Sequence, residues 1–331
     1  MASMGVRTLA ELIGHTEQLE ILPGETSKQR KLDLSPLLAN SALVSSKPQY
    51  CIDPHNEPFD KGVLGEKMLG DMRAAIATKS GGKFSYAVNN FDRSVGARIS
   101  GEIAKRWGNT GMSQAPLVVT LKGSAGQSFG VWNAGGLHLH LEGEANDYVG
   151  KGMAAGKIVL KPHTRSSFVA RETIIMGNTC LYGATGGELY AAGTTGERFA
   201  VRNSGALAVV EGAGDHCCEY MTGGVVCVLG RTGVNFGAGF TGGFAYVLDM
   251  ERDFVDRYNH ELIDIHRVSP EGMGIHIQHL RGLIEQHVEA TDSAWGAQLL
   301  NDFRTYIGRF WMVKPKAAAI DSLLENLRRA A

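Results

Sequence analysis

The chain has 331 residues, of which 44% are hydrophobic, a length that suits one large domain or two ordinary ones with a sizeable core. Its 33 lysine and arginine residues balance 34 aspartate and glutamate residues, which argues against a nucleic-acid or anionic-membrane partner. The 5 cysteines include no C-x-x-C pair, so a disulfide framework is not expected and a reducing cytoplasm is favoured. No long apolar run occurs, so a membrane span is not expected.

Residues 1–82 are predicted to form an N-terminal flank of mixed, partly helical structure. Met1–Met4 has the character of a leader added for expression and joined to a sequence cut from a longer one. Val6–Ile13 favours a short helix, Lys28–Leu38 is amphipathic, and Gly62–Ala77 has the spacing of a longer amphipathic helix. The apolar stripe of this last helix comprises Leu64, Met68, Leu69, Met72, Ala75 and Ile76.

A glycine-rich repeat occupies residues 83–250. Most of the 43 glycines lie between Gly123 and Gly243, and pairs of small residues recur about every nineteen residues, as in solenoid proteins. The one long interval contains a polar stretch, Lys161–Thr173, which is predicted to be a loop inserted into one coil. The second residues of the pairs, called the repeat glycines, are Gly136, Gly156, Gly187, Gly205, Gly224 and Gly243.

A short β-forming run follows each repeat glycine. Residues two and four positions later are predicted to face the core, because side chains alternate along a strand. The row after Gly136 is out of phase, which predicts a slip of one residue in that coil. Asp147, Asn178 and Asp215 each stand nine residues before a repeat glycine and indicate a recurring turn. The predicted core positions are Ile158 and Leu160, Leu189 and Ala191, Leu207 and Val209, Val226 and Val228, and Ala245 and Val247.

This pattern predicts a mainly β fold, a right-handed parallel β-helix with coils of about nineteen residues and helical flanks at both ends. Stacked strands lie about 4.8 Å apart, so glycine suits both the crowded corners and the turns that need a positive φ. The coils are predicted to begin near residue 83, with a clear strand at Leu117–Leu121. Residues 251–331 are predicted to form a C-terminal segment with helices at Gly274–Val288, Trp295–Trp311 and Ala317–Ala330.

Two clusters within the repeat are candidate binding sites. Gly237–Gly242 matches a dinucleotide fingerprint with Asp256 downstream, but strand-like Phe244–Leu248 follows where that fingerprint needs a helix, so structural glycines are favoured. Asp215–Glu219 contains carboxylate, imidazole and thiol groups of the kinds that bind metals. Adjacent residues of an extended coil point to opposite faces, so these side chains are not expected to converge on one ion.

The remaining candidates are side chains without an expected partner. His138 and His140 would share one strand face, and Lys151 could hold an anion in a turn, but both patterns are typical of ordinary surface residues. Three further histidines, His276, His279 and His287, lie on or near one helix face without a carboxylate at a suggestive spacing. No nucleophile elbow or phosphate-binding loop motif occurs. No residue is therefore predicted to be catalytic, cofactor-binding or metal-binding.

Several long motifs resemble a known family. They are Gly177–Gly187, Arg198–Gly205, Val210–His216, Glu219–Gly224 and Asn235–Gly239, with Asp92–Gly96 and Gly126–Trp132 upstream. Over about Gly5–Lys316 the chain resembles the C-terminal Gly-rich (GXGXG) β-helix domain of the glutamate synthase large, or alpha, subunit. A more distant likeness is to the β-helix subunit of formylmethanofuran dehydrogenase.

The resemblance implies a parent enzyme that converts glutamine, 2-oxoglutarate and a reductant into two molecules of glutamate, using FMN and an iron–sulfur cluster. This chain has none of the family's N-terminal catalytic cysteine, flavin barrel or cluster-type cysteine spacing, so no cofactor is expected in this segment. The resemblance implies a structural domain that braces the glutaminase and FMN synthase domains. Its expected partners are the remaining domains of the large chain and the small subunit, with self-association through uncovered edges.

The alternative is a different class of protein, a standalone ligand-binding or catalytic β-helix module. Its site would be the groove at Gly237–Thr241 or the cluster at Asp215–Glu219. The sequence leaves this alternative open, because both clusters lie within the repeat that also explains them structurally.

Overall fold

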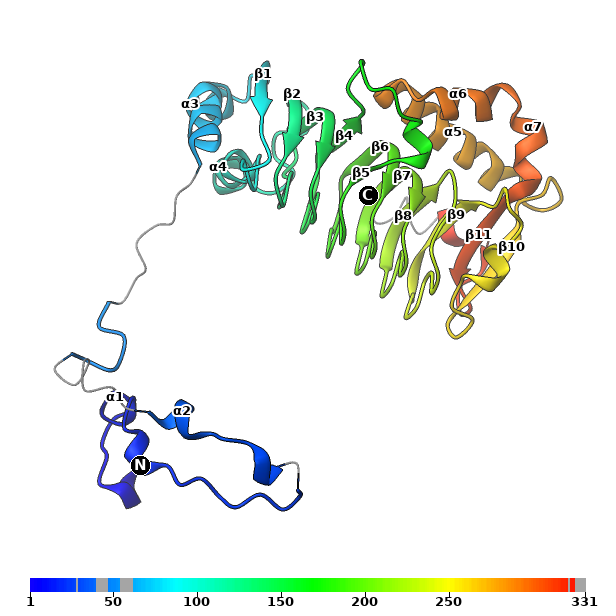
Figure 1. The fold of residues 1–331 in the computed structure, drawn as a ribbon. Coiled ribbons are helices and arrows are strands. Elements are labelled where there is room, and N and C mark those ends of the chain that lie inside the picture. Colours follow the sequence, from blue (N-terminus) through cyan, green and yellow to red (C-terminus); the bar gives the residue numbers. More distant parts are fainter. Residues whose placement is uncertain (28, 40–46, 54–61, 321, 325–331) are drawn as a thin grey trace. The chain divides into compact units, whose positions relative to one another are not determined.

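Two compact units make up the chain, and the computed structural model describes residues 1–27, 29–39, 47–53, 62–320 and 322–324 (Figure 1). The first unit, Met1–Asp60, holds only short helical segments in its described part, and none of its described residues is buried. The helix predicted at Val6–Ile13 is confirmed only over one turn. The segments are η1 (Ala2–Met4), α1 (Leu9–Leu12), η2 (Thr16–Gln18), η3 (Gln29–Lys31) and α2 (Ser35–Leu38).

The second unit, Lys61–Ala331, is built on a stack of parallel strands. Its described residues form an 11-stranded sheet, in which ten strands follow the order β1-β2-β3-β4-β6-β7-β8-β9-β11-β10 and β5 lies off this path, paired with β3 and β6. Every step from β1 to β9 is parallel. Parallel neighbours cannot be joined by a hairpin, so the rest of each coil carries the chain back to the start of the next strand. The predicted parallel β-solenoid is confirmed, and its right-handed winding stays a prediction. The parallel strands are β1 (Gly82–Val88), β2 (Leu117–Ala125), β3 (Leu137–Ala145), β4 (Lys157–Lys161), β5 (Ile174–Met176), β6 (Glu188–Thr195), β7 (Ser204–Ala213), β8 (Thr222–Val228) and β9 (Gly242–Leu248).

The interior of the solenoid is filled by apolar side chains that stack from coil to coil. Strand register places Leu139 opposite Ile158, and Ile158 opposite Leu189. The core positions predicted for every row except that of Gly205 are buried in this interior, so those predictions are confirmed. Two columns consist of Val119, Leu139, Ile158, Leu189, Ala208, Val226 and Ala245, and of Leu121, Leu141, Leu160, Ala191, Val210, Val228 and Val247.

The slip predicted for the row of Gly136 is confirmed. His138, two residues after this glycine, pairs with Lys157, only one residue after Gly156. The leucines that alternate with the histidines of β3 therefore enter the core columns, and the histidines face outward.

The row after Gly205 departs from the prediction by one residue. Ala208, rather than Leu207, lies opposite the core residues of β6 and β8. Leu207 and Val209 instead belong to the apolar cluster on the outer face of the sheet. The reason is that Ala206, and not Gly205, aligns with the repeat glycines of the neighbouring rows, so counting from Gly205 shifts the phase.

The segments between strands show a second regularity, in which alternate residues have positive φ although many of them are not glycine. Arg198, Ala200 and Arg202 have φ of 58°, 57° and 55°. Their N–H groups donate to both neighbouring coils: Arg198 to the carbonyl of Asp215 (2.8 Å), and Ala200 to the carbonyl of Cys180 (2.9 Å). These hydrogen bonds offset a conformation that costs about 1–2 kcal/mol per non-glycine residue. The equivalent triplets are Ser128, Gly130 and Trp132; Tyr148, Gly150 and Gly152; Thr179, Leu181 and Gly183; His216, Cys218 and Tyr220; and Asn235, Gly237 and Gly239.

Two helices close the N-terminal end of the stack (Figure 1). α3 (Val63–Thr78) confirms the helix predicted at Gly62–Ala77. α4 (Ala97–Trp107) is not predicted from the sequence, because the segment after Phe84 has a strand-like pattern that obscures it. The residues that α3 and α4 add to the interior core are Met68, Leu69, Met72, Ile76, Ile99 and Ile103.

The C-terminal segment closes the other end and covers part of the outer sheet face. β11 (Phe310–Pro315) pairs antiparallel with β9, and β10 (Ile263–Arg267) pairs antiparallel with β11. α5 (Gly274–Thr291) confirms the helix predicted at Gly274–Val288 and packs against β4, β6 and β7, over a second apolar cluster. The other helical segments are η5 (Ala170–Glu172), η6 (Phe254–Asp256), α6 (Ala294–Asn301), α7 (Phe303–Tyr306) and η7 (Ile307–Arg309).

The other helices predicted for this segment have different outcomes. A single helix at Trp295–Trp311 is wrong, because α6 ends at Asn301 and Phe310 already begins the strand that completes the sheet beside β9. Half of the helix predicted at Ala317–Ala330, residues 321 and 325–330, lies outside the described residues. The domain limits at residues 82 and 250 stay predictions. None of the described helices has the length and apolar character needed to cross a membrane.

Candidate functional site

The repeat glycines lie at coil corners where neighbouring backbones approach closely. Gly224 has a φ of 83°, and a Cβ atom there would collide with the carbonyl oxygen of Ala206. Gly205 has no positive φ, so the left-handed turn expected of the repeat glycines does not apply to it. Its constraint is the nearby carbonyl oxygen of Thr185. The other repeat glycines with positive φ are Gly136, Gly156, Gly187 and Gly243.

The metal-ligand candidates lie in two different places. Asp215 Oδ1 accepts an N–H from the next coil (2.8 Å), and His216 Nδ1 lies 3.6 Å from Glu219 Oε1. Cys217 and Cys218 are both buried in the solenoid interior with their sulfur atoms 3.8 Å apart. The expectation that neighbours alternate faces is wrong here, because Cys218 has a φ of 57°. Burial raises the pKa of the Cys218 thiol. Across the described parts of the chain, no three His, Cys, Asp or Glu side chains are placed to hold a metal ion.

The recurring turn is held by side chains that receive an N–H from the next coil. Asp147 Oδ1 accepts the N–H of Asn178 (2.8 Å), and Asn178 Oδ1 accepts the N–H of Glu197 (2.8 Å). Asp215 makes the same contact one coil further on. These polar residues therefore occupy equivalent turns, as the spacing predicts, and each of them also links its coil to the next.

The fingerprint-like glycines form one corner of a coil. Gly237 and Gly239 have φ of 71° and 68°, and β9 follows them, so the helix that a dinucleotide phosphate would need is replaced by a strand. The ring of Tyr220 lies against Gly239, where a Cβ would be 2.5 Å from the ring atom Cδ1. This contact accounts for a glycine at that position.

The candidate histidines lie on the outer side of the sheet. His138 and His140 are half-buried on β3, and burial lowers the pKa of both. On α5, His276 Nδ1 and His279 Nδ1 lie 2.9 Å and 3.2 Å from the Tyr246 hydroxyl. Burial, with a smaller contribution from the charge of His276, lowers the pKa of His279 to about 4. These three groups join α5 to β9.

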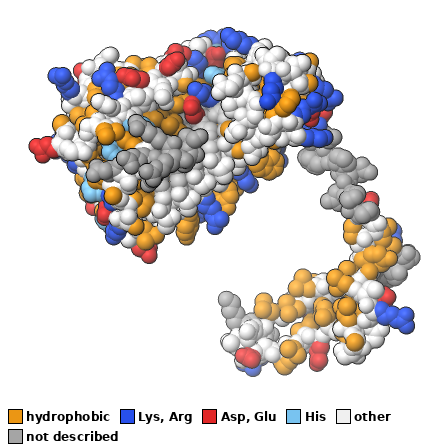
Figure 2. All heavy atoms as spheres, turned by 180° about the vertical axis from the view of Figure 1, so that it is seen from behind, with side chains coloured by type: hydrophobic (Ala, Val, Ile, Leu, Met, Phe, Trp, Pro, Cys, Tyr) orange, Lys and Arg blue, Asp and Glu red, His pale blue; other side chains and the backbone are white. Residues whose placement is uncertain are grey.

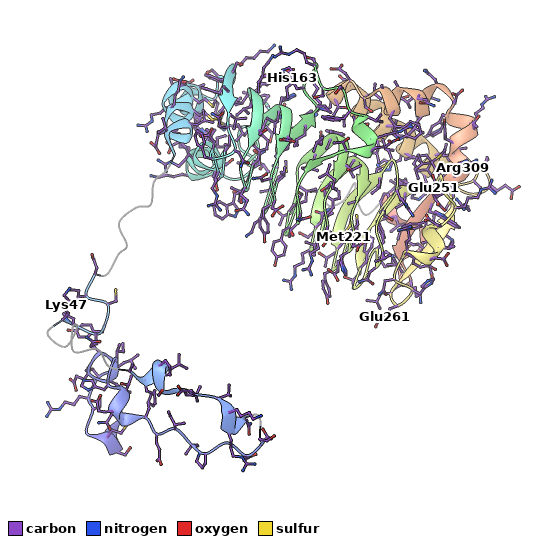
Figure 3. The ribbon with its side chains drawn as sticks, viewed as in Figure 1. Lys47, His163, Met221, Glu251, Glu261 and Arg309 are labelled. Carbon is purple, nitrogen blue, oxygen red and sulfur yellow. The ribbon has the colours of Figure 1, made fainter. Side chains whose placement is uncertain are left out.

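The inserted loop, Lys161–Thr173, rises from the coil between β4 and β5, and Figure 3 labels His163 on it. Thr164 donates its N–H to Glu142 Oε1 (3.3 Å), and His163 Nε2 lies 3.7 Å from the same oxygen. The other end of the loop reaches the C-terminal helices, where the Arg171 guanidinium carbon lies 4.5 Å from the centre of the Trp295 ring. The loop therefore bridges the outer sheet face and α6.

Lys151 makes contacts that fix it in its turn. Its Nζ lies 5.0 Å from the ring centre of Tyr148 and 5.7 Å from that of Tyr182. Cation–π contacts of this kind hold the ammonium group on the surface of the coil.

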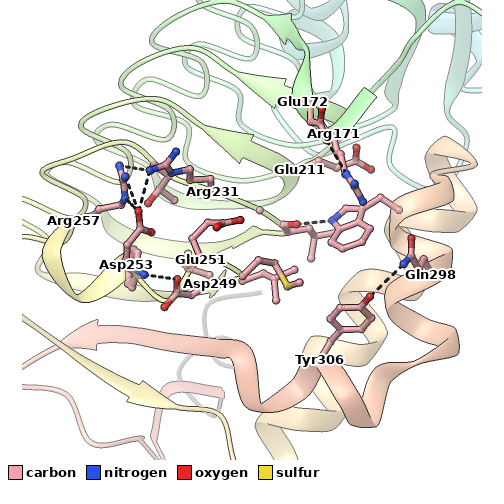
Figure 4. A pocket seen from close by; sticks show the side chains of 18 residues that line it. Arg171, Glu172, Glu211, Arg231, Asp249, Glu251, Asp253, Arg257, Gln298 and Tyr306 are labelled. Carbon is pink, nitrogen blue, oxygen red and sulfur yellow. Dashed lines mark hydrogen bonds and ion pairs between the residues drawn. The ribbon is translucent and has the colours of Figure 1, made fainter. Parts of the chain in front are cut away.

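A pocket of 760 Å³ lies between the ends of β7, β8 and β9 and the C-terminal helices (Figure 4), and no motif in the sequence indicates it. We call it the Glu211 pocket. A neighbouring pocket of 410 Å³ shares with it Arg171, Glu211, Trp295 and Gln298. The one signal in the sequence is Glu211 itself, a charged residue within the otherwise apolar run of β7.

Glu211 belongs to a buried polar cluster at the floor of this pocket. Its Oε1 accepts a short hydrogen bond from the Ser293 hydroxyl and lies 3.3 Å from His287 Nε2. Ser293 Oγ also accepts the N–H of Gly296 (2.9 Å), so the same serine caps the N-terminus of α6. His287 therefore has the carboxylate partner that the sequence spacing does not indicate, because Glu211 comes from a distant strand.

Three polar atoms near this cluster are buried and have no hydrogen-bond partner among the described residues. They are Glu211 Oε2, His287 Nδ1 and Thr232 Oγ1. Glu211 and Thr232 both line the pocket. Unpartnered buried groups are uncommon in folded proteins, and they mark a place where a ligand or a water can bind.

Charged and aromatic side chains surround the pocket (Figure 4). Asp253 Oδ2 accepts hydrogen bonds from the guanidinium groups of Arg231 (3.0 Å) and Arg257 (2.7 Å). The hydrogen bond from Arg257 lowers the pKa of Asp253. The Trp295 ring packs edge-on against Tyr306, with ring centres 5.8 Å apart. Its indole N–H donates to a backbone carbonyl of the pocket wall (2.6 Å).

The sequence is similar to known proteins over nearly its whole length. A family model described as the GXGXG motif matches residues 64–316. The ferredoxin-dependent glutamate synthase 2 of Synechocystis sp. is 46% identical over 320 residues, which are 95% of this chain and 20% of that protein. The ferredoxin-dependent glutamate synthase 1 of Arabidopsis thaliana is 45% identical, covering 95% of this chain and 19% of its own length. The NADH glutamate synthase of Schizosaccharomyces pombe is 42% identical, and the match covers 96% of this chain and 15% of that protein. The chain thus spans about a fifth or less of these relatives' length.

Proposed function

The chain belongs to the GXGXG motif family, and from this premise we propose that it is the β-solenoid domain of a glutamate synthase, where it braces the catalytic domains. The observation that carries the proposal is the similarity over 95% of this chain to only 20% of a ferredoxin-dependent glutamate synthase. The parent reaction, as the family resemblance implies, converts glutamine, 2-oxoglutarate and a reductant into two molecules of glutamate. The relatives are named for ferredoxin and for NADH, so the similarity assigns no electron donor.

The bracing role is supported by the way in which each coil holds its neighbours. Strand ladders join the coils on one side, and the N–H groups of the positive-φ triplets join them on the other. Helices plug one end of the interior, and an antiparallel pair of strands ends the sheet at the other. A stack bonded on both sides resists bending, so it can hold two catalytic domains at a set separation. The cofactors implied for the parent, FMN and an iron–sulfur cluster, would lie in its other domains.

Two measurements test this proposal. The purified 331-residue chain should show only protein absorbance, with no flavin or iron–sulfur band between about 350 and 500 nm. In the longer enzyme that carries this segment, Gly224→Val should uncouple glutamine hydrolysis from glutamate synthesis, because the bracing stack is weakened. A visible band that survives gel filtration, or full coupling in a Gly224→Val enzyme whose solenoid is demonstrably unfolded, would contradict the bracing role.

The standalone module is the second hypothesis, and the two sites proposed for it carry little support. Asp215 and Gly239 are engaged in contacts between coils, and Cys217 and Cys218 are buried. A binding function is better supported at the Glu211 pocket, which lies on the other side of the sheet.

A further inference from the structure

We propose that the Glu211 pocket binds a small organic cation that carries primary ammonium groups, such as an aliphatic diamine. This binding function goes beyond the bracing role and does not depend on it. The proposal rests on a buried carboxylate oxygen without a donor, on the charges that line the pocket, and on an aromatic wall that already contacts a cation.

Glu211 has one carboxylate oxygen that lacks a hydrogen-bond donor. Its side chain is only 1% exposed, and Oε1 is occupied by Ser293 and His287. Oε2 is buried and has no partner in the described chain, although Glu211 lines both adjoining pockets. A buried carboxylate is unfavourable unless its charge is paired and its oxygens are hydrogen-bonded. An N–H donor that arrives through the pocket supplies both.

His287 contacts only one oxygen of this carboxylate. A proton on Nε2 is enough to make the contact with Glu211 Oε1. A second proton, on the buried and unpartnered Nδ1, would leave a charged donor without an acceptor. His287 therefore meets Glu211 through Nε2 alone, and Glu211 Oε2 is still without a donor in the described chain.

The remaining charges of the pocket also favour a cation. Arg231 and Arg257 share the single carboxylate of Asp253, but the pocket as a whole is lined by three arginine and five carboxylate side chains, so negative formal charge predominates. Glu251 lines the same pocket and has no ion-pair partner within the described ranges. A ligand with two ammonium groups could place one at Glu211 and the other at Glu251.

The pocket walls suit the rest of such a ligand. The Trp295 ring already holds the Arg171 guanidinium at 4.5 Å, which shows that this wall stabilises a cation. Met250, which is 36% exposed, offers an apolar surface for a methylene chain, and the unpartnered Thr232 hydroxyl offers a second hydrogen-bonding group. The volume of 760 Å³ falls within the range of about 300–1,000 Å³ that is usual for small-molecule sites.

Calorimetric titration of the 331-residue chain with 1,4-diaminobutane, at an ionic strength held constant with NaCl, tests the proposal. We expect saturable one-to-one binding that weakens about tenfold or more in Glu211→Gln, the loss typical of one hydrogen bond to a charged group. Glu285→Gln is the matched control, because it removes a carboxylate that is 53% exposed on α5, outside the pocket. It should bind like the parent chain. Tetramethylammonium, a cation without N–H donors, should bind about tenfold more weakly than the diamine.

A second variant keeps the test decisive if Glu211→Gln fails to fold. Thr232→Val preserves the side-chain shape and removes a buried, unpartnered hydroxyl, so circular dichroism should show an unchanged or higher melting temperature. Its diamine affinity should nevertheless fall severalfold. Absence of saturable binding to the parent chain, equal affinities in folded Glu211→Gln and Glu285→Gln, or an unchanged affinity in Thr232→Val would overturn the proposal. A buried water would then account for Oε2.

Discussion

Left-handed backbone conformations recur at the same three places of each coil, in residues as different as Leu181, Arg198 and Gly237. A residue other than glycine is held in this conformation by hydrogen bonds to the coils on either side. The repeat glycines are under a stricter constraint, because a Cβ atom at several of them would collide with a carbonyl oxygen of the preceding coil. Backbone atoms cannot move aside as a flexible side chain can, so these positions tolerate no substitution without a shift of the coil.

Gly224→Val should therefore destabilise the solenoid. Its φ of 83° is unfavourable for a β-branched residue, and the new Cβ would meet the Ala206 carbonyl oxygen. We expect a loss of about 2–4 kcal/mol in the free energy of unfolding, measured by urea denaturation. Gly282→Ala, in the middle of α5 where nothing lies within 4 Å, is the control and should gain about 1 kcal/mol. An unchanged urea midpoint for Gly224→Val would show that the corner is not sterically limited.

Helix α5 is the element that joins the C-terminal segment to the solenoid. It carries His276 and His279, which contact the Tyr246 hydroxyl from β9, and His287, which contacts Glu211 from β7. Each contact joins a titratable ring to a buried strand residue. Because burial lowers the pKa of one of these rings, His279, the docking of this helix is expected to depend on pH.

His279 sets the direction of that dependence. Burial lowers its pKa in the folded state from 6.5 to about 4, so the unfolded chain binds the proton more readily between these values. The stabilising effect of the neutral ring is fully present above pH 6.5 and is lost as the pH falls towards 4. After allowance for the partial exposure of the ring, we expect a loss of about 1–2 kcal/mol.

Urea denaturation at pH of about 7 and about 4.5 measures this loss, and His279→Gln should show less of it than the parent chain. His260→Gln, at an exposed histidine outside α5, is the control and should keep the full loss. Identical pH dependence in the parent chain and His279→Gln would rule out His279 as the group responsible.

At the scale of the whole molecule, the two units differ in how they are stabilised. Each coil of the second unit buries side chains against the coils on both sides, whereas none of the described residues of Met1–Asp60 is buried. Apolar side chains crowd the surface of this first unit (Figure 2), and Leu22 and Leu37 are 75% and 76% exposed. The stability of the chain is therefore concentrated in the second unit.

Two deletions separate these contributions. Removal of residues 1–60 should change the unfolding free energy of the solenoid by less than about 0.5 kcal/mol, because no described core residue is lost. Removal of residues 1–78 also deletes α3, with Met68, Met72 and Ile76 at 0% exposure, and should cost about 5 kcal/mol or more. Chemical denaturation followed by circular dichroism measures both. An equal loss in the two deletions would mean that the first unit supports the stack.

The repeat period of the sequence predicts the solenoid, because each coil places the same steric and packing constraints on the equivalent residues. Small residues mark the corners, and apolar residues at alternate positions mark the interior, so the parallel stack and most core columns are predictable. The row of Gly205 shows where counting residues from the repeat glycine fails to predict the core positions. Ala206 can occupy the corner because its φ is not positive, unlike that of Gly187 and Gly224. Only the pairing of β7 with β6 and β8 reveals the shift.

The ends of the stack and its outer face were settled only by the tertiary structure. The helix α4 and the strand β11 are short segments whose patterns are ambiguous alone, and their places depend on the open ends that they complete. The Glu211 pocket joins a strand, an inserted loop and a helix that are far apart in sequence. No local sequence pattern predicts this pocket, because the Glu211 carboxylate acquires its partners only when α5 and α6 pack over β7. The sequence by itself therefore determined the repeating scaffold, through local sterics and alternation, and long-range packing decided the site.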